Sequence, residues 1–244
     1  MNKFFRFNFT KDTAVAFGTG AVMIFLSLIM LFFGGESLLD KAMSFILRDL
    51  LMIFGLGIVF VSLYVWKKAG CIKAIGFTGR KNILSLLLDF IFAAALLTMF
   101  LKEEKPSDIL EIKNLYAATY ILVAGIFEMT FIYSYLRASF EKAFGIIPAI
   151  LLTAAFYSFH HAGFQPEFLH LFFVGLMYCS VYYITQNLLI IFPFFWGVGA
   201  LWDVIVSSEA GNEIKNLESF IIALVILALS AGWIFLARRK RYVI

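Results

Sequence analysis

A small set of ionisable side chains lies inside otherwise apolar stretches of this sequence. Ionisable groups cost free energy in an apolar environment and commonly mark a functional site there. A buried carboxylate can act as a general base, and an imidazole can orient water, stabilise developing charge or bind a metal. Together they would suit hydrolysis, for which a peptide bond is the expected target. The acids are Asp89, Glu128 and Asp203, and the histidines are His160 and His161 in the stretch FYSFHHAGF, with His170 in the next apolar run.

Helical spacing predicts which of the acids face other helices. Gly125 and Ala124 stand three and four positions before Glu128. Small residues mark helix faces that pack closely against neighbours, so we expect Glu128 to point inward. Asp203 also follows small residues three and four positions back, and we expect it to point inward too.

The remaining acid and the third histidine have simpler interpretations. Asp89 lies close to a basic loop, so a structural ion pair with Arg80 or Lys81 is the expected role. His170 lies early in its helix, where contact with the surface or with lipid headgroups is the default expectation. Neither residue is predicted to take part in catalysis.

His160 and His161 are about 100° apart around a helix, so they cannot both face one site squarely. The face of His161 carries Tyr157 and Ser158 and is smaller and more polar than the face of His160. This favours His161 slightly as the inward residue, but the sequence leaves open which of the two faces the site.

The composition identifies the environment of these residues. The chain has 244 residues, of which 62% are hydrophobic and 15% are charged, against roughly 25% charged in a soluble domain. Mean hydropathy is +0.93. Basic residues occur in short clusters between apolar runs, which indicates membrane orientation and excludes nucleic acid as a partner. The two cysteines, Cys71 and Cys179, have neither a zinc-type spacing nor an expected disulfide.

The apolar runs predict an all-α, polytopic membrane protein. Each run approaches the roughly 20 residues that a membrane-spanning helix needs. We expect one helical bundle forming a single domain, residues 1–244, with a short interfacial helix at 137–145 between the fourth and fifth spans. In that helix Arg137, Glu141 and Lys142 should keep to water. The eight predicted spans are about 13–34, 49–66, 83–101, 115–136, 146–163, 166–185, 187–206 and 219–237.

This arrangement puts a constraint on the depth of the site. At a rise of 1.5 Å per residue, Glu128 and His160 would differ by about 10 Å in depth across the bilayer. A shared site would then need helix five to tilt, or residues 137–145 to sit below the headgroups.

The sequence around these residues resembles the CPBP (CAAX protease and bacteriocin-processing) intramembrane endopeptidases, over about residues 80–206. The first family motif is EExxxRGxL, and Glu128 and Leu136 of EMTFIYSYL match it. Met129, Tyr133 and Ser134 stand where the motif has glutamate, arginine and glycine. The resemblance implies that Glu128 activates water and that the supporting Glu–Arg pair of the family is lost.

Two further motifs extend the resemblance. Phe156 and His160 match the family's FxxxH, and Tyr157 with His161 matches it nearly as well. Asp203 fits the last position of the third motif, HxxxN or HxxxD, which supplies oxyanion donors in the family. A glycine, Gly199, replaces its histidine. The implied catalytic set is Glu128, His160, His161 and Asp203, and a divalent metal is one option for the cofactor.

Three functions stay open at this point. The first is an intramembrane endopeptidase that cleaves a membrane-associated peptide or protein. The second is a pseudoprotease that binds and regulates a membrane partner, which the lost third-motif histidine favours. The third is a small transporter or metal-binding membrane protein, which lacks the support of a repeat or a broken-helix pattern.

The topology gives the first testable prediction. Residues 1–12, the loop 67–82, Arg137 with Lys142, and the tail 238–241 together hold 14 of the 20 basic residues. Positively charged segments stay in the cytoplasm, so both termini should be cytoplasmic. A reporter fused after Ile244 should signal on the cytoplasmic side, and activity of that reporter only outside the cytoplasm would contradict the prediction.

Overall fold

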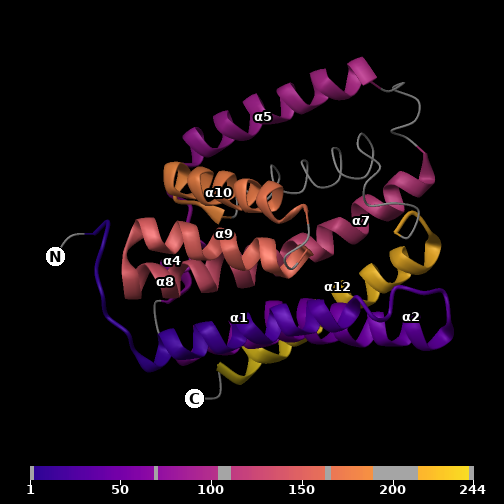
Figure 1. The fold of residues 1–244 in the computed structure, drawn as a ribbon, viewed down its shortest axis with the longest axis horizontal. Coiled ribbons are helices and arrows are strands. Elements are labelled where there is room, and N and C mark those ends of the chain that lie inside the picture. The colour runs from indigo at the N-terminus through magenta and orange to yellow at the C-terminus, as the bar shows by residue number, and fades with distance from the viewer. Residues whose placement is uncertain (1–2, 69–70, 104–110, 163–165, 189–213, 242–244) are drawn as a thin grey trace. The chain divides into compact units, whose positions relative to one another are not determined.

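The computed structural model describes residues 3–68, 71–103, 111–162, 166–188 and 214–241, and the elements in these ranges are helices (Figure 1). The chain divides into two compact units, which are described one at a time. The first unit combines Met1–Phe77 with Phe127–Ile184, and the second combines Thr78–Ile126 with Thr185–Ile244.

The expected all-helical membrane protein is confirmed, but the count of eight spans is not. Five helices in the described ranges are long and apolar enough to cross a membrane, and two shorter apolar helices accompany them. These seven correspond to seven of the predicted spans, and the eighth, about 187–206, lies almost wholly outside the described residues. The five helices are Lys11–Met30, Leu38–Lys67, Ile112–Phe144, Phe168–Thr185 and Leu217–Leu236, and the two shorter stretches are Asn82–Ala95 and Ile146–His161.

The first unit contains the helices that carry the candidate residues. Two of its elements are of the π type, in which each turn holds more residues than in an α-helix. The elements are α1 (Lys11–Met30), α2 (Leu38–Ser44), η1 (Phe45–Phe60), α3 (Val61–Lys67), α4 (Cys71–Ala74), η2 (Glu128–Leu136), α8 (Arg137–Phe144), α9 (Ile146–Ala162) and α10 (Phe168–Thr185). The described helices of the second unit are α5 (Asn82–Glu103), α7 (Ile112–Phe127, whose last residue belongs to the first unit) and α12 (Leu217–Arg241).

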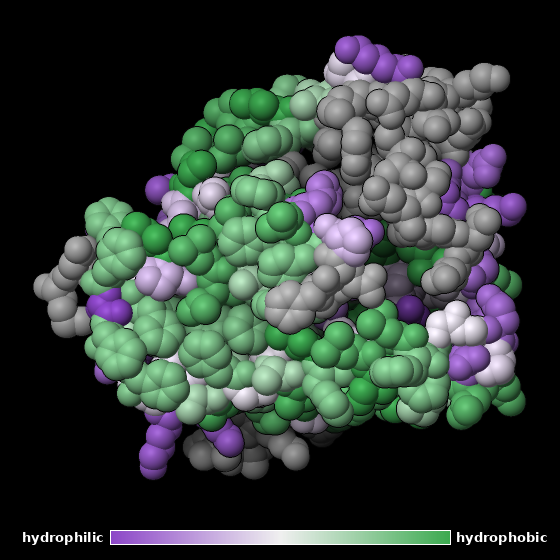
Figure 2. Space-filling view, viewed as in Figure 1, coloured by the Kyte–Doolittle hydropathy of each residue, from purple (hydrophilic) through white to green (hydrophobic). Residues whose placement is uncertain are grey.

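Helix α1 shows how these helices distribute their side chains. Thr10 caps its first turn, and Thr10 and Thr13 form a reciprocal capping box. The buried stripe of the helix is small or polar except at Met23, and it consists of Thr13, Ala16, Gly20, Met23 and Ser27. Large apolar residues of α1 such as Phe25 are exposed instead, and apolar residues cover much of the molecular face in Figure 2. Helices that pack against one another within lipid commonly bury small residues and expose large apolar residues.

Helices α7, η2 and α8 follow one another without a break from Ile112 to Phe144. Residues 137–144 therefore continue the long helix that contains Glu128. The prediction that Arg137 keeps to water is wrong, because this side chain is only 1% exposed. The location of α8 at a membrane surface stays a prediction.

The long helix ends in a tight turn at Gly145. The backbone of Gly145 has φ of +91°, a conformation that side-chain-bearing residues rarely adopt. Helix α9 begins at the next residue and packs back along α8 and η2. Glu128 and the two histidines thus lie on the two arms of one helical hairpin.

The extended N-terminal segment, residues 3–10, is bonded across this turn. The amides of Arg6 and Asn8 donate to the carbonyls of Phe144 and Ala143. The amides of residues 146 and 147 donate in return to the carbonyls of Lys3 and Phe4. The segment lies so close that a Cβ at Gly145 would come within 2.7 Å of the Phe4 carbonyl oxygen.

An aromatic cluster connects the N-terminal segment, α1, α8 and α9. Phe17 of α1 lies at its centre, with ring centroids 4.9 Å from Phe140 and 6.0 Å from Phe156. Phe140 and Phe156 pack on each other at 5.4 Å, and Phe9 stacks on Phe17 at 6.3 Å. Gly20 leaves the room that the Phe156 ring occupies, so α1 can approach α9 closely.

The turn generates a stability prediction. Gly145→Ala should lower the free energy of unfolding by about 1–3 kcal/mol, because alanine is strained at this φ and its Cβ would collide with the backbone of residue 4. Gly18→Ala in α1 is the matched control, since its Cβ would meet nothing within 4 Å and alanine favours a helix. Thermal unfolding of the purified protein in detergent measures both. Equal melting temperatures for the two variants would contradict the prediction.

Candidate functional site

The structure brings Glu128, His160 and His161 together. Glu128 is the first residue of η2, and the two histidines occupy the last turn of α9. One carboxylate oxygen and one nitrogen from each ring all lie within 4.8 Å of one another. Adjacent side chains of a helix can converge on a group that lies between their directions, so both histidines border this carboxylate despite their angular separation.

The closest contact joins Glu128 Oε1 to His161 Nε2 at 3.1 Å. The other ring nitrogen of His161, Nδ1, lies 3.0 Å from the backbone carbonyl oxygen of Tyr157. A carbonyl oxygen can only accept, so Nδ1 must carry a proton. The contact at Nε2 then needs one more proton, held either by the imidazole or by the carboxyl group. Glu128 and His161 therefore share a single proton.

His160 borders the carboxylate from another direction. Its Nδ1 lies 2.7 Å from the hydroxyl oxygen of Ser27 in α1. Its ring packs edge-on against Phe127 at 5.3 Å and against the ring of His161 at 4.9 Å. Contacts from three helices therefore fix this ring.

The site is buried on one side and accessible on the other. The side chain of Glu128 is 11% exposed and that of His161 is 31% exposed. A carboxylate that is nearly buried but next to a partly exposed imidazole can meet a water molecule or a peptide while it is shielded from bulk solvent.

Aromatic packing replaces charge around the first motif. Met129 and Tyr133 are both buried. The ring of Tyr133 lies 5.5 Å from Tyr157 and 5.4 Å from Tyr178, with edge-on geometry toward Tyr178. Tyr157 in turn contacts the His161 ring at 4.4 Å. The positions at which the family has a charged pair thus hold a buried thioether, Met129, and an aromatic ring, Tyr133, which packs on the tyrosine that contacts His161.

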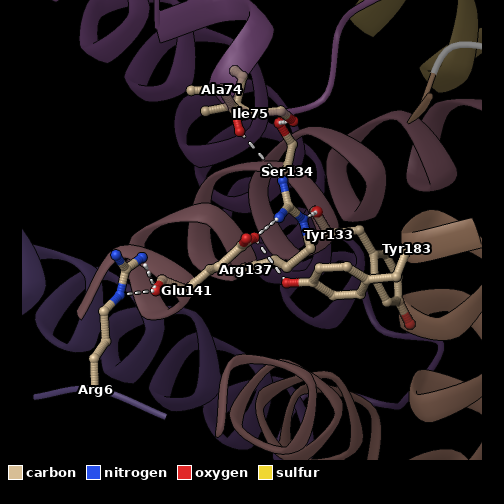
Figure 3. A network of polar contacts seen from close by, with 8 residues as sticks. All are labelled: Arg6, Ala74, Ile75, Tyr133, Ser134, Arg137, Glu141 and Tyr183. Carbon is tan, nitrogen blue, oxygen red and sulfur yellow. Dashed lines mark hydrogen bonds and ion pairs between the residues drawn. The ribbon is translucent and has the colours of Figure 1, made fainter. Parts of the chain in front are cut away.

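A buried charge lies one turn further along the helix, at Arg137 (Figure 3). Its Nε donates to the Tyr133 carbonyl at 2.8 Å, and its Nη1 pairs with Glu141 Oε2 at 2.6 Å. The Tyr183 hydroxyl donates to the same oxygen at 2.8 Å, and the guanidinium stacks 3.8 Å above the Tyr182 ring. This network links η2 and α8 to α10.

The same network reaches the N-terminal segment and α4. Arg6 Nε donates to the Glu141 backbone carbonyl at 3.0 Å, and Ser134 donates to the Ile75 carbonyl (Figure 3). Sequence reasoning missed this anchor. Its only signal is the four-residue spacing of Arg137 and Glu141, which predicts an exposed pair as readily as a buried one.

The remaining predicted residues are Asp203, His170 and Asp89. Asp203 lies outside the described residues, as does Gly199. His170 is exposed, as expected. In the part of the chain that the structure describes, the carboxylate oxygen Oδ2 of Asp89 is buried with no hydrogen-bond partner, so its expected pairing with a basic residue is not found.

Glu128, His160 and His161 also have the composition of a metal site. Two histidines and one glutamate are the protein ligands of many catalytic zinc ions, and the donor atoms here are close enough to converge on one ion. In that case these three residues would hold a divalent cation, which would polarise a carbonyl or activate a bound water. The shared proton between Glu128 and His161 would have to leave first.

Comparison with known proteins agrees with the resemblance noted in the sequence. Residues 111–204 match the family model of Rce1-like proteins, described as type II CAAX prenyl endopeptidases. The matched segment includes Glu128, His160 and His161. No curated protein and no solved structure matches the chain.

Removal of the buried guanidinium should destabilise the fold. Arg137→Met keeps an apolar stem but leaves Glu141 without its cation and the Tyr133 carbonyl without its donor. We expect a loss of about 3 kcal/mol, at the lower end for a broken buried pair because Glu141 is 31% exposed. Lys142→Met, an exposed change in the same helix, is the control and should melt like the wild type. Indistinguishable thermal unfolding of the two variants would show that the network contributes little.

Proposed function

Because residues 111–204 match the type II CAAX prenyl endopeptidase family, we propose that this protein is an intramembrane endopeptidase in which Glu128 and His161 activate water. The observation that carries the proposal is the 3.1 Å contact between Glu128 Oε1 and His161 Nε2, which joins the glutamate of the first motif to the histidine pair of the second. The substrate is a peptide or protein associated with the membrane, which reaches the site from the partly exposed side of His161.

The shared proton suggests how the two residues divide the work. When the proton is on the imidazole, Glu128 is a carboxylate and can accept a proton from a water molecule. The resulting hydroxide adds to the carbonyl carbon of the peptide, and the carbonyl oxygen becomes negatively charged. The His161 imidazolium lies beside this position and can stabilise that charge.

Collapse of the intermediate completes the reaction. The proton taken up by Glu128 passes to the amide nitrogen, the carbon–nitrogen bond breaks, and the fragments leave as a carboxylic acid and an amine. One water is consumed for each bond cleaved, and both residues return to their starting protonation. In a site shielded from bulk water these electrostatic contributions are larger than in solution.

The third motif determines how fast such an enzyme can be. With Gly199 in place of histidine, one oxyanion donor of the family pattern is missing, which typically costs about 10²–10³ in rate. For Asp203, which lies outside the described residues, we propose a role in positioning or donating to the substrate, and Asp203→Asn should therefore be tolerated.

A pseudoprotease is the second candidate, and one observation favours it. Met129 and Tyr133 are buried in well-packed surroundings, so the positions of the family's supporting ion pair have become part of an apolar core. A protein with this core could bind a membrane peptide without cleaving it.

Substitution of the glutamate separates the two functions. Glu128→Gln keeps size and hydrogen-bonding capacity but removes the basic carboxylate, so it should lower the turnover of an endopeptidase by about 10²–10⁴ while folding and peptide binding persist. His161→Ala should abolish cleavage and His160→Ala should weaken it. The measurement is cleavage of a membrane-anchored peptide library by purified protein in liposomes, with bound metal determined on the same samples.

The control for this experiment is Glu36→Gln, a change at an exposed glutamate far along the chain from the site. It should leave turnover at the wild-type value. If Glu128→Gln also cleaves a verified substrate at the wild-type rate, the endopeptidase proposal is wrong. If the wild type and Glu128→Gln instead regulate a membrane partner equally well, that result would support the pseudoprotease.

A further inference from the structure

Helix α1 contributes a residue to the site although it lies outside the matched segment. Ser27 is buried, and its hydroxyl oxygen is 2.7 Å from His160 Nδ1. No step of the proposed mechanism uses Ser27, and none of the sequence motifs includes it. A short contact between a buried hydroxyl and a site histidine raises the question of what the serine does.

The surroundings of the Ser27 hydroxyl favour one direction for this hydrogen bond. Its oxygen lies 3.1 Å from the Met23 backbone carbonyl oxygen and 3.6 Å from the Met52 sulfur. A carbonyl oxygen accepts only and a thioether sulfur is a weak acceptor, whereas the hydroxyl has one proton to give. Of the three neighbours, only the imidazole can donate.

One assignment satisfies all of these groups. Ser27 donates its proton to the Met23 carbonyl, as serines in apolar helices commonly do, and accepts the Nδ1 proton of His160. The reverse assignment would leave the hydroxyl oxygen and the Met23 carbonyl oxygen facing each other in a buried place with no proton between them. Two oxygen atoms held this close without a proton between them repel each other, and the second lone pair of the Met23 carbonyl would lose its hydrogen bond.

We propose that Ser27 is a positioning residue that holds neutral His160 in the tautomer protonated at Nδ1. The lone pair of His160 is then at Nε2, the nitrogen turned away from α1. His161 has the same tautomer-fixing arrangement through the Tyr157 carbonyl. The Ser27 hydroxyl thus holds Nδ1 of His160, and the Tyr157 carbonyl holds Nδ1 of His161. In both rings Nε2 is the nitrogen that does not contact this partner.

The consequence for catalysis rests on the proposed function. His161 Nε2 is engaged with Glu128, so His160 Nε2 is the ring nitrogen left to accept a hydrogen bond from the attacking water and orient it. A His160 protonated at Nε2 could not accept there. Ser27 would therefore affect turnover through His160 without touching the substrate.

Nitrogen NMR tests the assignment without any substrate. The chain has only three histidines, so ¹⁵N-histidine labelling gives a spectrum of six ring nitrogens. Chemical shifts distinguish protonated from unprotonated ring nitrogens, and His161→Gln and His170→Gln assign the signals. In lipid nanodiscs at a pH where His160 is neutral, we expect His160 to be protonated at Nδ1 and bare at Nε2.

Three variants separate tautomer control from general packing. Ser27→Ala removes the acceptor, so His160 should move to the Nε2-protonated form that an unconstrained neutral histidine side chain prefers. Ser27→Thr keeps a hydroxyl and should retain the wild-type signature. Ser180→Ala is the matched control, because the Ser180 hydroxyl donates to a carbonyl four residues back on an exposed helix face, and it should leave the histidine signals unchanged.

An activity measurement completes the test. Ser27→Ala should lower kcat by about 10–100-fold, as for loss of a residue that orients a functional histidine, with little change in KM, and Ser27→Thr should restore most of it. A wild-type His160 bare at Nδ1, or a Ser27→Ala spectrum like that of the wild type, would overturn the proposal. The spectra report on Ser27 even if Glu128→Gln shows that the protein is no endopeptidase, so the two failures are distinguishable.

Discussion

The turn at Gly145 is the constraint on which the site depends. Glu128 lies 17 positions before this residue and His161 lies 16 positions after it. The two arms of the hairpin therefore have nearly the same number of residues, although the first includes the π-type element η2. The carboxylate and the imidazole meet because the arms of the hairpin are nearly equal in length. A shift of the turn by a few residues would move them out of reach of each other.

Polar groups at the hairpin are matched to their partners. The Tyr157 carbonyl fixes one nitrogen of His161, and the Ser27 hydroxyl contacts one nitrogen of His160. At the turn end of the hairpin, Arg137 and Glu141 satisfy each other, and tyrosines from α10 complete their contacts. An apolar environment makes each unpaired group costly, so the same contacts that stabilise the helices also fix the orientation of the side chains.

The sequence predicted the class of protein and the residues that lie together better than it predicted the geometry. Apolar runs and basic clusters identified a helical membrane protein, and ionisable residues in those runs identified Glu128, His160 and His161, because both signals depend on composition and local spacing alone. The estimate of a 10 Å difference in depth depended on an elbow at 137–145 lying flat at the membrane surface. In the structure these residues continue the helix, which removes the difference. Burial of Arg137 could not be predicted, because it depends on Tyr182 and Tyr183, more than 40 positions away.

The N-terminal segment places a condition on the order of biogenesis. Arg6 is bonded to Glu141, and 135 positions separate them. A ribosome adds roughly 5–20 residues per second, so residues 3–10 exist for on the order of ten seconds before their partners are synthesised. During that interval four phenylalanines, Phe4, Phe5, Phe7 and Phe9, form with Lys3 and Arg6 a short basic and aromatic peptide suited to rest at the membrane surface. Residues 3–10 thus reach their final contacts only after residues 141–147, at the turn of the hairpin that carries the site, have been synthesised.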